Sequence, residues 1–168
     1  MKKLILMLLF VAPMTAFAQK FGHIDSQALL SSLPEAIKIQ GELEALGKNY
    51  EASLKEMQDE LQRKADEYDK TKSTMNATKQ AETEASLQEL YSKIQQAVSD
   101  NQQAFNKAQQ EKLGPILEKV RNAIAAVAKS GGYVYIMELN GGQPLYINET
   151  LSKDITAEVK AELAKSKK

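Results

Sequence analysis

Few side chains in this sequence could take part in covalent or metal chemistry. His23 is the only histidine, and the chain has no cysteine. Metal sites and nucleophilic sites are mostly built from several such side chains held together. We therefore expect neither a histidine-based metal site nor a Ser-His triad, and we interpret His23 as a strand residue. Gly131-Gly132 follows a helical segment, and a phosphate would bind at the other end of a helix.

Carboxylates are abundant, but their arrangement is that of a solvated surface. Acidic residues alternate with Lys and Arg at helical spacing, as in Glu51 and Lys55 or Asp59 and Arg63. This pattern is typical of exposed helix faces. The chain carries 22 basic and 22 acidic residues, so its overall charge gives no indication of nucleic-acid binding. We expect no enzyme activity, no cofactor and no metal.

Residues 1–18 have the composition of a secretory signal peptide. Lys2 and Lys3 precede an apolar run, and Ala16-Phe17-Ala18 supplies the small residues of a cleavage site. The apolar run is shorter than the roughly 20 residues that a membrane-spanning helix needs. We expect cleavage after Ala18 and a location outside the cytoplasm. A retained membrane anchor is the alternative.

Residues 34–113 are rich in Gln, Glu, Lys and Ala and predict two long helices. Apolar residues recur at alternating spacings of three and four, which is the rhythm of a coiled coil. In the first half these positions are Leu43, Gly47, Tyr50, Leu54, Met57, Leu61, Lys64 and Tyr68. In the second half they are Leu87, Tyr91, Ile94, Val98, Asn101, Phe105 and Ala108. Thr, Ser and Asn interrupt the rhythm over 71–78 and favour a turn, so we expect an antiparallel coiled-coil hairpin.

Three further signals mark the ends of these helices. Ser32 and Glu35 have the spacing of a capping box at the start of the first helix. Gly114-Pro115 predicts that the returning helix kinks or restarts, because proline cannot donate a backbone hydrogen bond. Gly131-Gly132 predicts the end of that helix.

Residues 19–33 and 114–168 predict a small body that contains β-strands. Residues 20–24 form one expected strand, while 133–139 and 144–147 form an expected hairpin that the first strand joins. Thr156 begins a last helix. Such a core is small, and its strands carry large apolar groups on both faces, so we expect copies of the chain to associate through the body. The expected oligomerisation residues are Phe21, Ile24, Tyr133, Tyr135, Ile136, Tyr146 and Ile147.

Side chains near the turn of the hairpin could contact other proteins. Flexible methionines and amphipathic tyrosines suit a surface that binds many sequences weakly. The candidate contact residues are Tyr68, Met75, Met57, Lys70, Lys72 and Lys79. The alternative is that the apolar members hold the two helices together and that the lysines serve solubility.

The whole segment after residue 18 resembles the Skp/OmpH family of periplasmic chaperones. The resemblance rests on Asp25-Ser26-Gln27-Ala28-Leu29-Leu30 after the first strand, the long hairpin, and Pro115-Ile116-Leu117-Glu118-Lys119-Val120. It also rests on Ala128-Lys129-Ser130-Gly131-Gly132-Tyr133 and on Lys153-Asp154-Ile155-Thr156-Ala157-Glu158-Val159.

The resemblance implies a mainly helical, jellyfish-like homotrimer in which strands of three chains form a small β-barrel. Three hairpins would surround a cavity that holds unfolded outer-membrane β-barrel proteins in the periplasm without ATP. In well-known members the hairpins are strongly basic, whereas residues 34–113 here carry 15 acidic and 11 basic residues. We therefore expect client binding through apolar contacts, and contact with a membrane surface is not required.

A coiled-coil adaptor that bridges other proteins of the cell envelope is the second interpretation. The hairpins of efflux adaptors have a similar pattern, but they belong to chains with additional lipoyl-like and barrel domains. The length of this sequence leaves no room for such domains.

Overall fold

The computed structural model describes residues 19–139, 144 and 146–165. The expected signal peptide over 1–18 lies outside these residues. The chain divides into two compact units, one formed by Ala28–Arg121 and the other by Met1–Gln27 with Asn122–Lys168. We call them the helical unit and the sheet unit.

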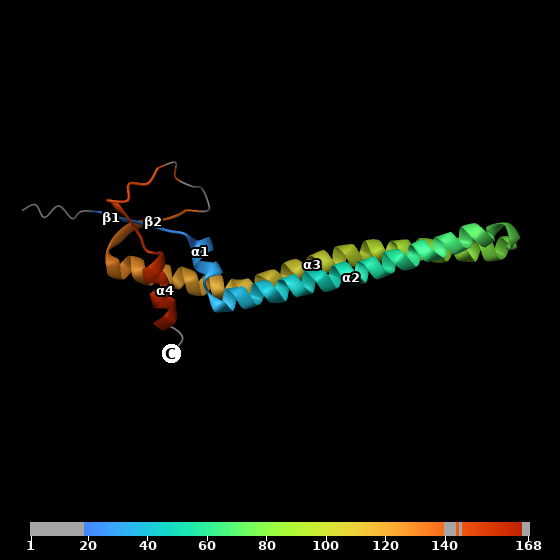
Figure 1. Ribbon diagram of the computed structural model, residues 1–168, viewed down its shortest axis with the longest axis horizontal. Helices are drawn as coiled ribbons and strands as arrows, with labels where there is room; N and C mark the ends of the chain where they lie inside the picture. Colours follow the sequence, from blue (N-terminus) through green and yellow to red (C-terminus); the bar gives the residue numbers. More distant parts are fainter. Residues whose placement is uncertain (1–18, 140–143, 145, 166–168) are drawn as a thin grey trace, which may run out of the picture. The chain divides into compact units, whose positions relative to one another are not determined.

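Helices dominate the chain. Helix α1 covers Ser26–Ser31, α2 covers Pro34–Thr71 and α3 covers Ala77–Gly131. Within the helical unit α2 and α3 lie side by side and run in opposite directions (Figure 1). The Lys112 ammonium pairs with Glu42 at 2.6 Å, and the Tyr68 hydroxyl donates to Glu84 at 2.5 Å, far from the first pair along both helices. The two long helices are as predicted.

The turn between α2 and α3 also follows the prediction. A single 3₁₀ turn, η1, covers Lys72–Thr74. The Asn76 side chain then accepts a hydrogen bond from the backbone N–H of Lys79 at 2.8 Å, which caps α3. The Gln80 side-chain amide donates to the carbonyl of Lys72 at 2.7 Å and fixes the turn from the other side.

The capping box predicted at the start of α2 is wrong. Leu33 occupies the cap position in an extended conformation and makes no side-chain cap bond. The Ser32 hydroxyl instead donates to the carbonyl of Leu29 at 2.8 Å. Because a residue before proline is pushed out of the helical region, Pro34 places the helix start one residue later than the Ser32 pattern requires.

The seam between α2 and α3 confirms most, but not all, of the predicted positions. Every predicted position of α2 is buried or half-buried. On α3, Tyr91 and Val98 are 51% and 45% exposed, so their assignment to the seam is wrong. The less exposed Leu90 and Ala97 lie in the seam instead. Tyr91 with Val98 and Leu90 with Ala97 both fit an alternating spacing of three and four. The prediction from the sequence chose the larger side chain at each position.

Helix α3 passes through Pro115 as one continuous helix, so of the two predicted outcomes, a kink or a restart, the restart is wrong. Gly114 and Pro115 are exposed. Water can therefore satisfy the carbonyl that loses its helical partner to the proline. Helix α3 ends at Gly131 as predicted, and Gly132 adopts a left-handed conformation with φ of 67°.

The sheet unit contains three parallel strands in the order β2-β1-β3. Strand β1 covers Lys20–Ile24, β2 covers Tyr133–Glu138 and β3 covers Ser152–Asp154. Strand β1 pairs with β2 as predicted, but the predicted antiparallel hairpin with 144–147 is wrong. Residues 144, 146 and 147 lie outside any strand. The segment 139–151 is long enough to cross over β1 and deliver β3 to its far edge in parallel.

One face of this sheet belongs to the core of the sheet unit. The buried apolar residues of the unit are Ile24, Ala123, Val127, Ile155, Val159 and Leu163, the last two from helix α4, Thr156–Lys165. A methyl group on Gly22 would lie 3.2 Å from the ring of Tyr133. Gly22 therefore lets the Tyr133 ring lie flat against β1. Among the residues that the structure describes the sheet is open, with β2 and β3 at its edges.

Candidate functional site

Over β1 and β2 the opposite face of the sheet is largely apolar and is uncovered by the part of the chain that the structure describes, while β3 adds the polar Ser152 and Asp154 to it. Paired residues of parallel strands point to the same face, and the register pairs Phe21 with Tyr135 and His23 with Met137. Tyr135 is 67% exposed, Met137 50% and Phe21 38%. The rings of Phe21 and Tyr135 stack with centroids 6.4 Å apart. We call these four side chains the open face.

The other residues expected to mediate oligomerisation occupy different environments. Ile24 is buried in the core, and the Tyr133 ring lies against Gly22 and Gly131. Ile136 and Ile147 are half-buried, whereas Tyr146 is 78% exposed. The structure thus brings Phe21 and Tyr135 together on the open face. It also adds Met137, which was not among the residues expected from the sequence.

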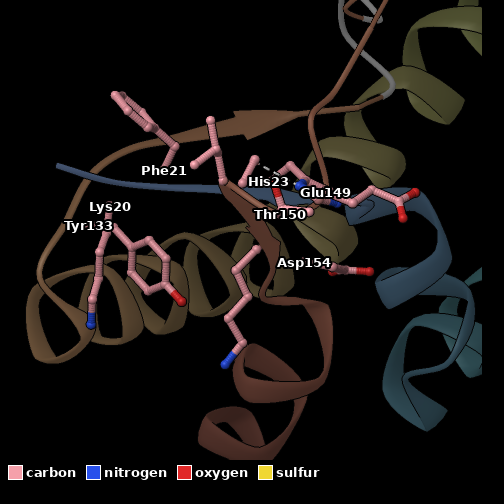
Figure 2. A pocket seen from close by; sticks show the side chains of 10 residues that line it. Lys20, Phe21, His23, Tyr133, Glu149, Thr150 and Asp154 are labelled. Carbon is pink, nitrogen blue, oxygen red and sulfur yellow. Dashed lines mark hydrogen bonds between the residues drawn. The ribbon is translucent and has the colours of Figure 1, made fainter. Parts of the chain in front are cut away.

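His23 lies at the edge of a cavity of about 700 Å³ next to β3 (Figure 2). Its Nδ1 atom forms a hydrogen bond with the Ser152 hydroxyl at 2.9 Å, and the ring is only 9% exposed. Sequence analysis missed this pair. The two residues are 129 positions apart, and nothing local marks Ser152-Lys153-Asp154 as a strand beside β1.

The pair does not have the organisation of a catalytic triad, although Asp154 is nearby. The Asp154 carboxylate accepts hydrogen bonds from the hydroxyl and the backbone N–H of Thr156 at 2.6 and 2.8 Å. The hydroxyl bond holds the pKa of Asp154 below its ordinary value, with smaller contributions from the backbone bond and the nearby His23. Asp154 therefore caps helix α4, and the His23–Ser152 bond joins β1 to β3.

A second candidate site lies at the turn end of the helical unit. Tyr68, Met75 and Lys79 line a groove of about 290 Å³, together with Leu87. Tyr68, Met75 and Leu87 are half-buried. The hydrogen bond to Glu84 raises the pKa of Tyr68 and holds its ring in place. The structure thus brings three of the predicted contact residues together.

The remaining predicted contact residues lie outside this groove. Met57 is half-buried at its seam position. Lys70 lies in a separate shallow depression on α2, and Lys72 pairs with Asp69 at 2.9 Å. Lys79 is itself paired with Glu82 at 3.3 Å. These ion pairs balance the positive charge near the turn.

Tyr91 and Val98, exposed apolar side chains on α3, were not predicted as contact residues. Tyr91 and Val98 are seven positions apart, which places them on one face of the helix. A signal was present in the sequence: Leu90 and Ala97 satisfy the spacing of the seam as well as Tyr91 and Val98 do. One residue of each neighbouring pair is therefore left over for the exposed side of the helix. Helix α3 therefore has an apolar face wider than its seam.

Among the described residues, no cluster of three or more His, Asp or Glu side chains is arranged to hold a metal ion. No helix in the described part of the chain is both long enough and apolar enough to cross a bilayer.

A family model described as "Outer membrane protein (OmpH-like)" matches residues 20–163. The chain belongs to the OmpH-like family. The match extends over residues of both the helical unit and the sheet unit, including those of the open face and the groove. No curated protein sequence matches this OmpH-like chain.

A solved structure has the same fold as this OmpH-like chain. It is a crystal structure from Caulobacter crescentus CB15, described as that of a candidate outer membrane chaperone (OmpH-like). The TM-score is 0.71 at 18% sequence identity, and the match covers 88% of this chain and 85% of that one. The fold is thus retained although most residues differ.

Proposed function

We propose that this OmpH-like chain is a periplasmic holdase chaperone that binds unfolded outer-membrane proteins and keeps them from aggregating without ATP. The observation that carries the proposal is that a family-typical fold exposes large apolar side chains on each of its units. They lie on the open face of the sheet unit and at Tyr91 and Val98 of the helical unit. Large exposed apolar side chains that share a face mark surfaces that bind other proteins.

The first step of the proposed mechanism is assembly through the sheet unit. The outer edge of β2 has no partner strand within the described part of the chain, and the open face exposes Phe21, Tyr135 and Met137. Unpaired edges and uncovered apolar faces favour association with further strands. Three chains that join their sheets into a closed barrel would satisfy both, and we propose this homotrimer.

The second step is capture of the client by the helical units. Each helical unit has an exposed apolar stripe at Tyr91 and Val98 and a groove lined in part by Met75 and Leu87. Each such contact is weak, but several helical units in one assembly hold an unfolded chain with an avidity far above that of one contact. The excess of acidic residues over 34–113 favours this apolar mode over capture by positive charge.

An aggregation assay tests the proposal. An unfolded outer-membrane β-barrel protein is diluted from denaturant with stoichiometric amounts of the processed chain, and light scattering is followed. We expect suppressed scattering, and a weaker effect for the double variant Tyr91→Ser with Val98→Ser. The matched control is Gln88→Ser with Gln95→Ser, two exposed polar positions also seven residues apart on α3.

Unchanged aggregation in the presence of the chain would refute the chaperone proposal. Equal loss in both double variants would show that the exposed apolar stripe is not the client surface. Recovery of one stoichiometric partner from the cell envelope, instead of many unfolded β-barrel proteins, would favour the adaptor interpretation.

A further inference from the structure

Helix α3 carries a second heptad row beside the seam that it shares with α2. The row is offset by one residue from the seam and keeps its alternating spacing of three and four. Glutamines alternate in it with larger apolar side chains, and its members are Gln88, Tyr91, Gln95, Val98, Gln102, Phe105 and Gln109. We call these seven residues the outer row. Its glutamines are exposed, and so are Tyr91 and Val98, whereas Phe105 is half-buried.

The outer row forms an uncharged strip along α3. The residues three and four positions away from Tyr91, Val98 and Phe105 are Leu, Ile, Asn, Ala and Gln, and none of them is charged. At 3.6 residues per turn, the charged residues of this part of α3 fall on the opposite side of the helix. Two ion pairs form there, one of Lys93 with Glu89 at 2.7 Å and one of Lys107 with Glu111 at 3.9 Å.

The spacing of the outer row fits an α-helix as its partner. Successive apolar members are seven residues apart, which is about 10 Å along the helix. An extended chain presents side chains on one side about every 7 Å, so it stays in step with the row over only a short distance. A second helix with the same heptad spacing stays in step over the whole row.

A second copy of α3 suits this surface by its chemistry. A glutamine side chain both donates and accepts hydrogen bonds, so the glutamines of one outer row can bind those of another. Residues 34–113 carry 15 acidic and 11 basic residues, so two helical units repel each other on average. Contact through the outer row brings no like charges together on α3, and it places apolar side chains of the two copies against each other.

We propose that α3 of one copy packs along α3 of a second copy through the outer row, and that this contact covers Tyr91 and Val98 while no client is bound. Polar residues at alternate positions of a helix contact reduce its stability, so the contact can open. The competition with a client rests on the proposed function, in which the same two side chains bind an unfolded protein.

Cross-linking between introduced cysteines tests the contact, because the chain has no cysteine of its own. Val98 is the middle residue of the outer row, so Val98→Cys places two thiols close together whichever way the second helix runs. The matched control is Gln96→Cys, an exposed position on the opposite side of α3. With a short bismaleimide reagent, we expect dimers of Val98→Cys to form at least about tenfold faster, since thiols held together react at a higher effective concentration.

Charges introduced into the outer row supply a second test. Gln95→Glu with Gln102→Glu places like charges on both copies and should slow cross-linking through Val98→Cys by about tenfold. Mixing with copies that carry Gln95→Lys, Gln102→Lys and Val98→Cys should restore the rate, because opposite charges then face each other in either direction of packing. The matched control is Gln96→Glu with Gln103→Glu, which should leave the rate unchanged.

The outcomes separate this proposal from the proposed function. Equal rates for Val98→Cys and Gln96→Cys refute the contact, and so does a rate that glutamates in the outer row do not lower. An unfolded β-barrel protein added before the reagent should slow cross-linking through Val98→Cys several-fold by mass action. An unchanged rate refutes the competition, whereas the holdase proposal fails only in the aggregation assay. If the glutamate variant does not fold, the comparison of the two cysteine variants decides alone.

Discussion

The register of the helical seam can be tested with two aliphatic residues four positions apart on α3. Ile94 is 5% exposed and Val98 is 45% exposed. Truncation of Ile94 to Ala removes three carbon atoms from an almost fully buried site. At about 0.8 kcal/mol for each buried carbon, the loss is about 2.4 kcal/mol before any cavity is counted. We expect Ile94→Ala to destabilise the chain by about 2–4 kcal/mol.

The matched change at Val98 should behave differently. The side chain is largely in water already, and alanine is the better helix former, so Val98→Ala should alter the unfolding free energy by less than about 0.5 kcal/mol. If the seam followed the larger apolar side chains of the sequence pattern, both truncations would be costly. The contrast between the two variants therefore distinguishes the observed seam from the one predicted from the sequence.

Urea unfolding followed by circular dichroism at 222 nm measures this contrast. With a urea dependence of about 2 kcal/mol/M, Ile94→Ala should lower the midpoint by about 1–2 M, while Val98→Ala should leave it nearly unchanged. All samples need the same protein concentration, because association adds to the apparent stability. A midpoint for Val98→Ala as low as that for Ile94→Ala would refute the seam assignment.

Three further results are expected. Gly22→Ala should destabilise the sheet unit by about 1–3 kcal/mol, because the new methyl group meets the Tyr133 ring at 3.2 Å; near-ultraviolet circular dichroism of the tyrosines during thermal unfolding would show it. Asp154→Ala should cost about 1 kcal/mol at neutral pH through loss of the α4 cap. Because hydrogen bonding lowers the pKa of Asp154 in the folded chain, this contribution is fully present above the ordinary carboxyl value of about 4 and is lost as the pH falls through the lowered value, so the difference between variant and wild type in urea titrations should shrink as the pH is taken further into the acid range. Glu84→Gln should lower the raised pKa of Tyr68 toward its ordinary value, and a phenolate absorbance titration that is unchanged by the substitution would contradict the hydrogen bond.

The helices were predictable because their signals are local. A long stretch of helix formers, a polar interruption and a terminal Gly131-Gly132 pair each act within a few residues. The choice between Tyr91 and Leu90 at one seam position was not local. It depends on which side of α3 the other helix lies, and both residues satisfy the same spacing.

The sheet was harder to predict because its pairing is set by distant parts of the chain. Strand β3 consists of Ser152-Lys153-Asp154, three polar residues that have low strand propensity on their own. They form a strand because β1 offers a free edge and because His23 and Thr156 bind their side chains. Some predicted site residues do come together, namely Phe21 with Tyr135 and Tyr68 with Met75. In each case the two residues lie on segments that the sequence already predicted to be neighbours.

The central position of β1 has a consequence for the order in which the chain folds. Both neighbours of β1 come from residues after 132, so the first strand of the chain has no partner until nearly all of the sequence is available. Contacts between segments so far apart in sequence form slowly, whereas the helices can nucleate early from local interactions. The sheet, and with it any association through the open face, should therefore form last. Strand β1 remains unpaired until then.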